Sequence, residues 1–478
     1  MTALDSTDQQ KVSAPLDASE PVSDSLFSRF GRWWNRKGDD APSPATPDPA
    51  QQTLSTRAIK RQREQLRQCF EARLTDGAAN AAALAWQDEY QAAAEPLRQA
   101  MLGVLADVAA GRDAPGGGAG GSAGAAGAPS GLSQALSNAR IRFFKRFAAQ
   151  HGKRGDSACG LHFLIQLRSD MLRWQKRIAG LRALDEDLEA LFSNWFDVGL
   201  LELQPITWDS PASLLEKLIR YEAVHEISSW NDLRNRLDSD RRCYAFFHPR
   251  IPREPLIFVE VAFVPEMAAN VQALLDEAAP LEDLRRVKWA IFYSISNTQA
   301  GLRGVSFGNF LLKRVIEELQ REFPKLKQFA TLSPIPGFAD WLRKQDGDSV
   351  ARILGDKRLS RWRERHGDAP ADGAAWFGAL PADAQDPVIR DTALALVARY
   401  LVREGGKGVP ADPVARFHLG NGACVERVNW GADLSRKGRA QSCGVMVNYL
   451  YVPEALDDNL ARLGDGNPRV SRAVAKLL

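Results

Sequence analysis

The sequence lacks the features of a secreted, membrane-spanning or metal-binding protein. Its 5 cysteines are scattered and include no CxxC pair, which is typical of a chain kept in a reducing compartment. It contains no signal peptide and no run of about 18 apolar residues, the length that a membrane span requires. The 6 histidines show no HExxH motif and no pair at i, i+4 spacing. We therefore expect no metal and no membrane span.

An excess of charge of one sign is also missing. The chain carries 62 Lys and Arg against 59 Asp and Glu, a net charge of +3, which does not favour nucleic acid as a partner. A basic stretch at 57–67 is interrupted by Glu64 and Leu66, so a solvated helix face is the better interpretation. With 478 residues and 45% hydrophobic residues, the chain is too long for one ordinary core, and we expect two or three domains.

The pattern of residues divides the chain into three parts. Residues 1–55 are rich in Asp, Ser, Pro, Thr and Gln, which predicts a disordered tail. Residues 56–204 show helical periodicity, interrupted by a flexible Gly- and Ala-rich loop at 111–131, and we expect a helical bundle domain there. Pro205 and a Ser-Pro-rich segment then mark the start of a second domain, 205–478. Two apolar stripes that predict helix faces in the first domain are Leu164, Leu167, Met171 and Trp174, and Leu184, Leu188, Leu191 and Trp195.

The second domain mixes strands with helices. Apolar runs at 256–264, 289–296 and 328–332 predict the central strands of a mixed sheet, and 423–430 and 444–452 predict two later strands. The intervening region 339–407 is mostly helical by pattern and is rich in Trp and Arg. It either covers the active site as an insertion or only packs against the sheet.

The most informative stretch runs from Trp289 to Phe338. It is interpreted as a strand, a turn with glycines, an amphipathic helix that ends at Pro324, a second strand, and Ser333 in a loop with two prolines. Backbone N–H groups of the turn and the helix N-terminus suit an anionic ligand such as a pyrophosphate. On spacing alone a purely structural turn is the better explanation of the glycines, because the turn is neither a Walker A loop nor a GxGxxG fingerprint.

This stretch, together with 417–423 and 442–449, closely resembles the malonyl-CoA decarboxylase family. The blocks that carry the resemblance include FYSISNTQ, KRVIEELQREFP and LSPIPGF, and a looser likeness extends from about Ala58 to the C-terminal strands. The resemblance implies an α+β protein, with an N-terminal all-helical domain for self-association and a GNAT-like mixed α/β catalytic domain that binds acyl-CoA. It implies malonyl-CoA as the substrate, a homo-oligomer (dimer or tetramer), and decarboxylation to acetyl-CoA and carbon dioxide without a cofactor.

By the same resemblance, Ser333 and His418 match the family's catalytic serine and histidine. Losing carbon dioxide from a thioester leaves an enolate that must be stabilised and then protonated. An imidazole, neutral or protonated, is a natural proton carrier near pH 7, so His418 is the expected general acid. Ser333 is expected to orient the carboxylate or to relay a proton, since a lone serine hydroxyl is a weak base. Without the resemblance, a structural histidine is the commoner interpretation.

The family's CoA-contacting turn falls on 303–309, and two other residues are candidates for the pocket. In animal members of the family that this sequence resembles, a glutamate occupies the position of Ser306; if that carboxylate assists the histidine in them, another group must do so here. The C-terminal residues Lys476-Leu477-Leu478 are not a peroxisomal SKL signal, and we expect a cytoplasmic location. The expected CoA-contacting residues are Arg303, Gly304, Val305, Ser306, Phe307, Gly308 and Asn309, and the possible pocket residues are Asn421 and Tyr449.

Two other functions stay open at this point. An acyl-CoA-dependent N-acyltransferase of GNAT type would use a related scaffold, although the sequence shows no obvious acidic cluster for an amine. A non-catalytic acyl-CoA sensor would bind malonyl-CoA tightly without turnover. The product formed from malonyl-CoA distinguishes these two functions from a decarboxylase.

Overall fold

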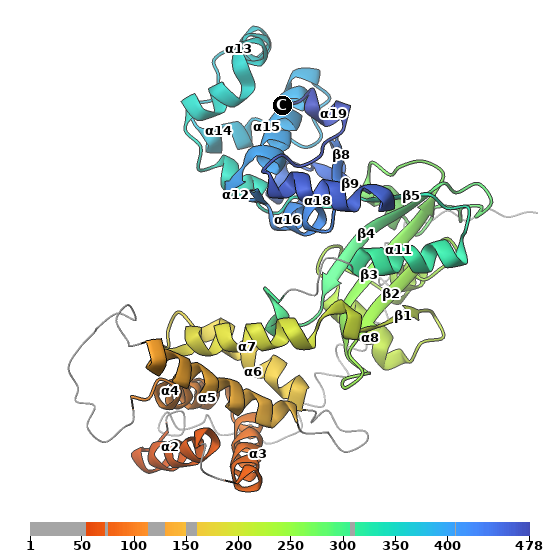
Figure 1. Cartoon of the computed structure of the whole chain (residues 1–478). Helices are drawn as coiled ribbons and strands as arrows, with labels where there is room; N and C mark the ends of the chain where they lie inside the picture. The colour runs from red at the N-terminus through yellow and green to blue at the C-terminus, as the bar shows by residue number, and fades with distance from the viewer. Residues whose placement is uncertain (1–53, 72–74, 113–129, 150–159, 306–310, 407) are drawn as a thin grey trace, which may run out of the picture. The chain divides into compact units, whose positions relative to one another are not determined.

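The computed structural model describes residues 54–71, 75–112, 130–149, 160–305, 311–406 and 408–478. The predicted tail 1–55 and the predicted loop 111–131 therefore lie almost wholly outside the described residues. Helices come first and strands follow (Figure 1). The predicted α+β class, a helical region followed by a mixed sheet domain, is confirmed by this order.

The first part of the chain is helical, and its helices bury the predicted stripes. Of the two stripes, only Trp195 is not fully buried. Aromatic side chains from three helices fill the core, with the rings of Trp86, Phe147 and Phe163 within 6.4 Å of one another. Apolar side chains at helical spacing therefore serve packing here. The helices are α2 (Thr56–Phe70), α3 (Asp76–Ala92), α4 (Glu95–Ala109), α5 (Ser130–Ala148), α6 (Gly160–Trp174) and α7 (Leu181–Trp195).

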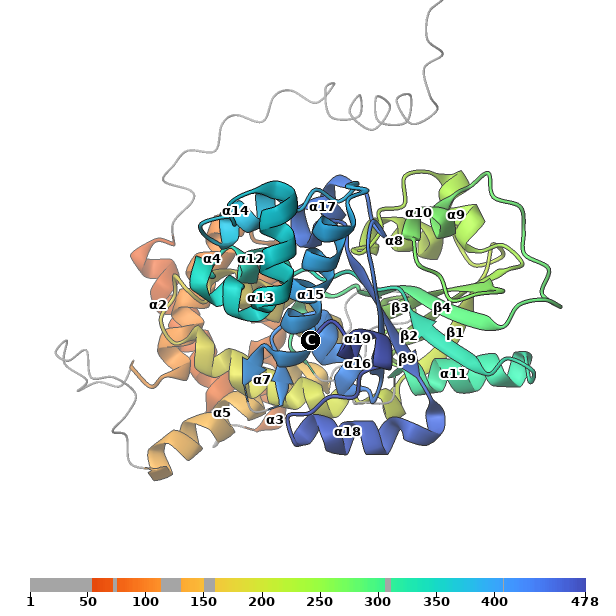
Figure 2. The same ribbon diagram turned by 90° about the horizontal axis from the view of Figure 1, so that it is seen from above.

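A seven-stranded sheet follows in the order β1-β2-β3-β4-β5-β9-β8. Only β4 and β5 run parallel, and α11 (Leu311–Glu322) joins them, whereas the other neighbours are antiparallel. Strands β3 and β4 lie side by side in both ribbon views (Figure 2). The strands are β1 (Glu202–Ile206), β2 (Arg241–Phe247), β3 (Pro255–Val264), β4 (Trp289–Asn297), β5 (Gln328–Thr331), β8 (Cys424–Asn429) and β9 (Met446–Tyr451).

The five strands predicted from apolar runs are confirmed to within two residues at each end. Strand β1 spans the predicted boundary at 204 and 205, and neither β1 nor β2 was predicted. The region 339–406 is mostly helical, as predicted. The remaining helices are α8 (Ala212–Tyr221), α9 (Trp230–Arg236), α10 (Val271–Leu275), α12 (Phe338–Leu342), α13 (Gly347–His366), α14 (Gly373–Gly378), α15 (Pro387–Arg403), α16 (Pro413–Gly420), α17 (Arg436–Ser442), α18 (Leu456–Gly464) and α19 (Arg472–Ala475).

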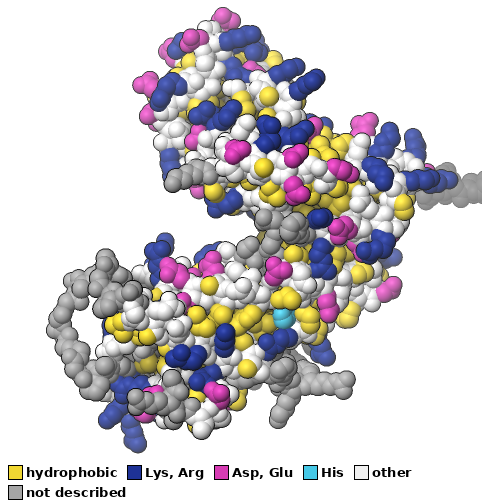
Figure 3. Space-filling model, in the orientation of Figure 1, with side chains coloured by type: hydrophobic (Ala, Val, Ile, Leu, Met, Phe, Trp, Pro, Cys, Tyr) yellow, Lys and Arg dark blue, Asp and Glu magenta, His cyan; other side chains and the backbone are white. Residues whose placement is uncertain are grey.

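The surface carries charge of both signs. In Figure 3, Lys and Arg side chains are interspersed with Asp and Glu over the visible face. This mixture agrees with the small net charge of +3. In the described part of the chain, none of the helices combines the length and the apolar character that a membrane crossing requires.

Candidate active site

Ser333 lies two residues beyond the end of β5, and its backbone is held in place by β9. Its N–H donates to the carbonyl of Val447 at 2.9 Å, and its own carbonyl accepts from the N–H of Val447 at 3.0 Å. Pro334 follows directly and restricts the backbone, because its ring locks φ. The hydroxyl group of Ser333 therefore starts from a rigid backbone position.

His418 lies in the last turn of α16, and a buried carboxylate ties this helix to the serine loop. Asp412 caps α16 by accepting from Val414 N and Ala415 N at 2.9 and 3.0 Å. Its other oxygen accepts from the N–H of Gly337, in the loop that follows Ser333, at 3.1 Å. One side chain thus sets the position of the histidine helix relative to the serine loop.

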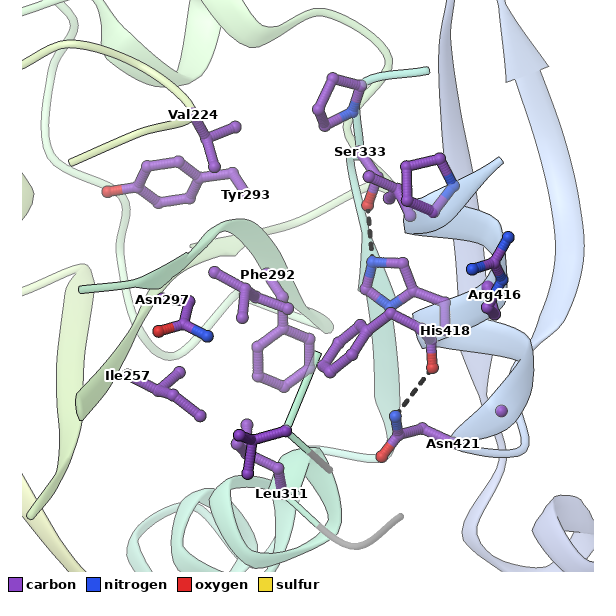
Figure 4. Close-up of a pocket in the computed structure, with 17 residues that line it drawn as sticks. Val224, Ile257, Phe292, Tyr293, Asn297, Leu311, Ser333, Arg416, His418 and Asn421 are labelled. Carbon is purple, nitrogen blue, oxygen red and sulfur yellow. Dashed lines mark hydrogen bonds between the residues drawn. The ribbon is translucent and has the colours of Figure 1, made fainter. Parts of the chain in front are cut away.

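The two predicted side chains are in contact. Ser333 Oγ lies 3.1 Å from His418 Nε2, although the residues are 85 positions apart in the chain (Figure 4). Ser333 Oγ donates its single proton to Thr331 Oγ1 at 2.8 Å, so it must accept from Nε2. The Tyr451 hydroxyl lies 2.9 Å from Nδ1 and donates to it. These bonds select the tautomer of a neutral imidazole that carries its proton on Nε2, facing Ser333.

Burial keeps this imidazole neutral. His418 is only 3% exposed, and burial lowers the pKa of its imidazole to about 3. Of the two protonation states considered for His418 near pH 7, the structure therefore favours the neutral one. Ser333 is also buried, at 5% exposure.

A cavity of about 400 Å³ opens next to the pair. This volume is within the usual range for small-molecule sites. Its wall is largely apolar, as Figure 4 shows, with His418 and Ser333 on one side and β4 on the other. The lining residues are Val224, Ile257, Phe292, Tyr293, Ile295, Asn297, Val305, Leu311, Ser333, Pro334, Pro413, Val414, Arg416, Phe417, His418, Gly420 and Asn421.

Family models match most of the chain. The malonyl-CoA decarboxylase C-terminal domain matches residues 199–478, and the malonyl-CoA decarboxylase N-terminal domain matches residues 122–196. The chain belongs to the malonyl-CoA decarboxylase family. The resemblance noted in the sequence is thereby confirmed.

Relatives with established names agree with this assignment. The mitochondrial malonyl-CoA decarboxylase of Rattus norvegicus is 39% identical over 340 residues, which is 67% of this chain and 68% of the relative. That of Anser anser anser is 36% identical over 365 residues, or 72% and 71% of the two chains.

Solved structures of malonyl-CoA decarboxylases are also similar to this one. The crystal structure from Cupriavidus metallidurans is 83% identical, has a TM-score of 0.79, and covers 88% of this chain and 100% of its own. That from Rhodopseudomonas palustris is 36% identical, has a TM-score of 0.69, and covers 87% and 99%.

The CoA-contacting residues expected from the malonyl-CoA decarboxylase family are only partly described. Val305 lines the cavity, while Arg303 and Gly304 lie in the turn before it, where Gly304 has a φ of +83° that favours glycine. The predicted contacts Ser306, Phe307, Gly308 and Asn309 lie outside the described residues.

The two possible pocket residues hold different positions. Asn421 lines the cavity, its Nδ2 donates to the Phe417 carbonyl at 2.7 Å, and its Oδ1 is buried without a hydrogen-bond partner among the described residues. Tyr449 instead stacks on the His418 ring, with centroids 4.6 Å apart and an interplanar angle of 25°. Its hydroxyl is likewise buried with no hydrogen bond to the described part of the chain.

Sequence reasoning missed several residues around the pair. Asp412, Thr331 and Tyr451 belong to no recognisable motif and lie far apart in the chain. The Asp-Pro pair at the start of α16 is nevertheless a helix-start signal that would have marked Asp412.

Strand β4 carries a bulge, because Glu260 pairs with Ser294 and Val261 with Phe292, so that Tyr293 is the extra residue. Bulges often lie next to active sites, and Tyr293 lines this cavity.

The described residues contain no group of three His, Cys, Asp or Glu side chains suited to holding a metal ion. The polar side chains that line the cavity are instead two hydroxyls, one imidazole, two amides and the guanidinium of Arg416, which donates to the Pro410 carbonyl at 3.2 Å. Such groups carry out proton transfer and bind carboxylates.

Proposed function

We propose that this protein decarboxylates malonyl-CoA to acetyl-CoA and carbon dioxide. The observation that carries the proposal is the contact between Ser333 Oγ and His418 Nε2, at 3.1 Å, beside a largely apolar cavity in a chain of the malonyl-CoA decarboxylase family. The family name supplies the substrate, and the hydrogen-bonded pair supplies the proton that the reaction requires.

In the proposed reaction the bond between the carboxylate carbon and C2 of the malonyl group breaks. Carbon dioxide leaves, and the electron pair moves through C2 to the thioester oxygen, forming an enolate. The apolar wall favours this step, since it solvates the localised charge of a carboxylate less well than the delocalised charge of the transition state. C2 must then receive one proton to give acetyl-CoA.

The pair of Ser333 and His418 is proposed to deliver that proton. The α-carbon of a thioester is a far weaker acid than an alcohol or a neutral imidazole, so its enolate takes a proton from either group. The Nε2–H of His418 points to Ser333 Oγ, and Ser333 lines the cavity, so in the relay the Ser333 hydroxyl turns its proton from Thr331 Oγ1 to C2 while Nε2 supplies Oγ with another. We assign Ser333 as the relay and His418 as the proton donor, and a solvent proton restores the pair after the product leaves.

The remaining expectations are proposals of the same kind. We propose that Arg303, Gly304, Val305, Ser306, Phe307, Gly308 and Asn309 contact CoA, that the chemistry needs no cofactor, and that the protein acts in the cytoplasm. We also propose that residues 56–204 form a self-association domain that gives a dimer or tetramer, and that 205–478 form the catalytic domain. A solution mass equal to that of one chain would contradict self-association.

Incubation of the purified protein with malonyl-CoA and EDTA tests the proposal, with acetyl-CoA followed by mass spectrometry. We expect product from the wild type and at least about a hundredfold less from Ser333→Ala and from His418→Ala, since both changes remove the proton path. Full activity in His418→Ala would overturn the assignment of the donor. Tight binding of malonyl-CoA without product would favour a sensor, and acyl transfer only in the presence of an amine would favour an acyltransferase.

A further inference from the structure

Arg168 in the helical region is buried, and each of the three nitrogens of its guanidinium group donates a hydrogen bond. The side chain is 1% exposed. Its Nε donates to Asp185 Oδ1 at 2.8 Å, and its Nη2 donates to Glu189 Oε2 at 2.7 Å. Its Nη1 donates to two backbone carbonyls, those of Gly301 and Arg303, each at 2.8 Å. The arginine thus joins α6 and α7 to a segment more than 130 residues further along the chain, since it lies 133 residues from Gly301.

That segment, Ala300 to Val305, packs directly on α6. A Cβ atom added to Gly301 would lie 1.9 Å from the carbonyl oxygen of Ile165, so only glycine allows this approach. Arg168 serves four acceptors at once, two carboxylates and two carbonyls of the segment, which the five N–H donors of a guanidinium allow and the three donors of a lysine ammonium do not. The segment therefore takes its position from the helical region.

The same segment forms part of the cavity. It begins three residues after Asn297, the last residue of β4, and ends at Val305, and both residues line the cavity. The N–H of Val305 donates to the Leu302 carbonyl at 3.1 Å, which closes the segment into a compact turn. A shift of this segment therefore moves Val305 at the cavity wall. Ser333 and His418 are held independently, by β9 and by Asp412.

We propose that Arg168 is a positioning residue for substrate binding, which acts from the helical region by holding the 300–305 segment at the cavity. This inference rests on the proposed decarboxylase function. Arg168 contacts no lining residue that carries out proton transfer. Its loss should therefore weaken binding of the CoA thioester and leave the chemical step nearly unchanged, which appears as a rise in KM with kcat retained.

The test compares Arg168→Lys with Arg146→Lys. Arg146 is also a buried arginine of the helical region, but it bonds Cys69, Asp76 and Asn80 within that region. For each variant we would measure KM and kcat for malonyl-CoA, the calorimetric Kd of acetyl-CoA, and Tm. Arg168→Lys should raise KM and Kd about tenfold and change kcat less than about twofold, since three donors on one nitrogen cannot serve all four buried or half-buried acceptors of the guanidinium. Arg146→Lys should lower Tm with KM and Kd unchanged.

Glu189→Ala gives a second, milder variant in case Arg168→Lys does not fold. Its side chain is 40% exposed, so its loss should be tolerated, while one of the carboxylates that hold Arg168 is removed. We expect KM and Kd to rise about threefold, in line with a modest loss of charge-assisted hydrogen bonding. Unchanged KM and Kd in a folded Arg168→Lys protein, or in Glu189→Ala where only that variant folds, would overturn the inference. So would a loss confined to kcat.

The two proposals fail in different ways. If the wild type forms no acetyl-CoA from malonyl-CoA, the proposed function fails, and the Kd of acetyl-CoA for wild type and Arg168→Lys still tests the role of Arg168. If the wild type also binds no acetyl-CoA, both proposals are refuted.

Discussion

Replacing Tyr451 by phenylalanine removes one hydroxyl group and tests how the His418 tautomer is selected. That hydroxyl donates to Nδ1 at 2.9 Å, and both side chains are almost fully buried. Without it, no solvent reaches Nδ1 to replace the lost bond. The imidazole then loses the interaction that places its proton on Nε2, next to Ser333.

The magnitude follows from the burial. A buried acceptor left without a donor costs about 1–3 kcal/mol, so kcat should fall roughly tenfold to a hundredfold. The malonyl-CoA KM should stay within about twofold, since the Tyr451 hydroxyl contacts the far side of the ring and not the cavity. Initial rates of acetyl-CoA formation over a range of malonyl-CoA concentrations separate the two parameters.

Tyr449→Phe is the matched control. Tyr449 stacks on the same imidazole, but its hydroxyl makes no hydrogen bond to the described residues, so the variant keeps the stacking and loses no bond. Its kcat should stay within about twofold of wild type, as expected when an unpaired polar group is removed. Full kcat in Tyr451→Phe, or an equal loss in both variants, would refute selection of the tautomer by Tyr451.

Three other predictions concern pH and the serine loop. Because burial lowers the His418 pKa to about 3, kcat should show no inflection near pH 6.5, and a fall there would identify the imidazolium as the donor. The unfolded state, with its ordinary histidine pKa of 6.5, binds more protons than the native state between that pH and about 3. The contribution of His418 to stability should therefore fall as pH drops below 6.5 and stay constant above it, which urea unfolding measures as the difference in pH dependence between wild type and His418→Gln. Gly337→Ala should lower both kcat and Tm, because its Cβ would lie 2.1 Å from the Tyr400 hydroxyl, whereas a Cβ at Gly378 meets nothing within 4 Å and Gly378→Ala should be neutral.

The pattern of apolar residues predicted the central strands and missed the first two. Strand β3 is buried along nearly its whole length, so its apolar run is visible in sequence. Strand β1 has a mostly exposed or half-buried pattern, and β2 begins with two arginines. Arg241 in β2 is buried against Asp240, a pairing that the local pattern does not reveal. Such strands are defined by the neighbours they pair with.

Some residues of the candidate site were identified from the sequence and others were missed. Ser333 and His418 were identified by resemblance to the malonyl-CoA decarboxylase family, since neither a serine before proline nor a lone histidine is distinctive by itself. Tyr451, Thr331 and Asp412 were not identified. Their contributions depend on contacts between β5, β9 and α16, which come from separate parts of the chain.

The sequence by itself determined the order of the helical region and the mixed sheet and the apolar stripes and runs that form their cores, because these depend on local periodicity. Only the tertiary structure decided that His418 is neutral with its proton facing Ser333, because that state depends on burial and on the Tyr451 hydroxyl. The contact of Arg168 with the 300–305 segment has the same origin, since a guanidinium group can satisfy distant carbonyls only after the chain has folded.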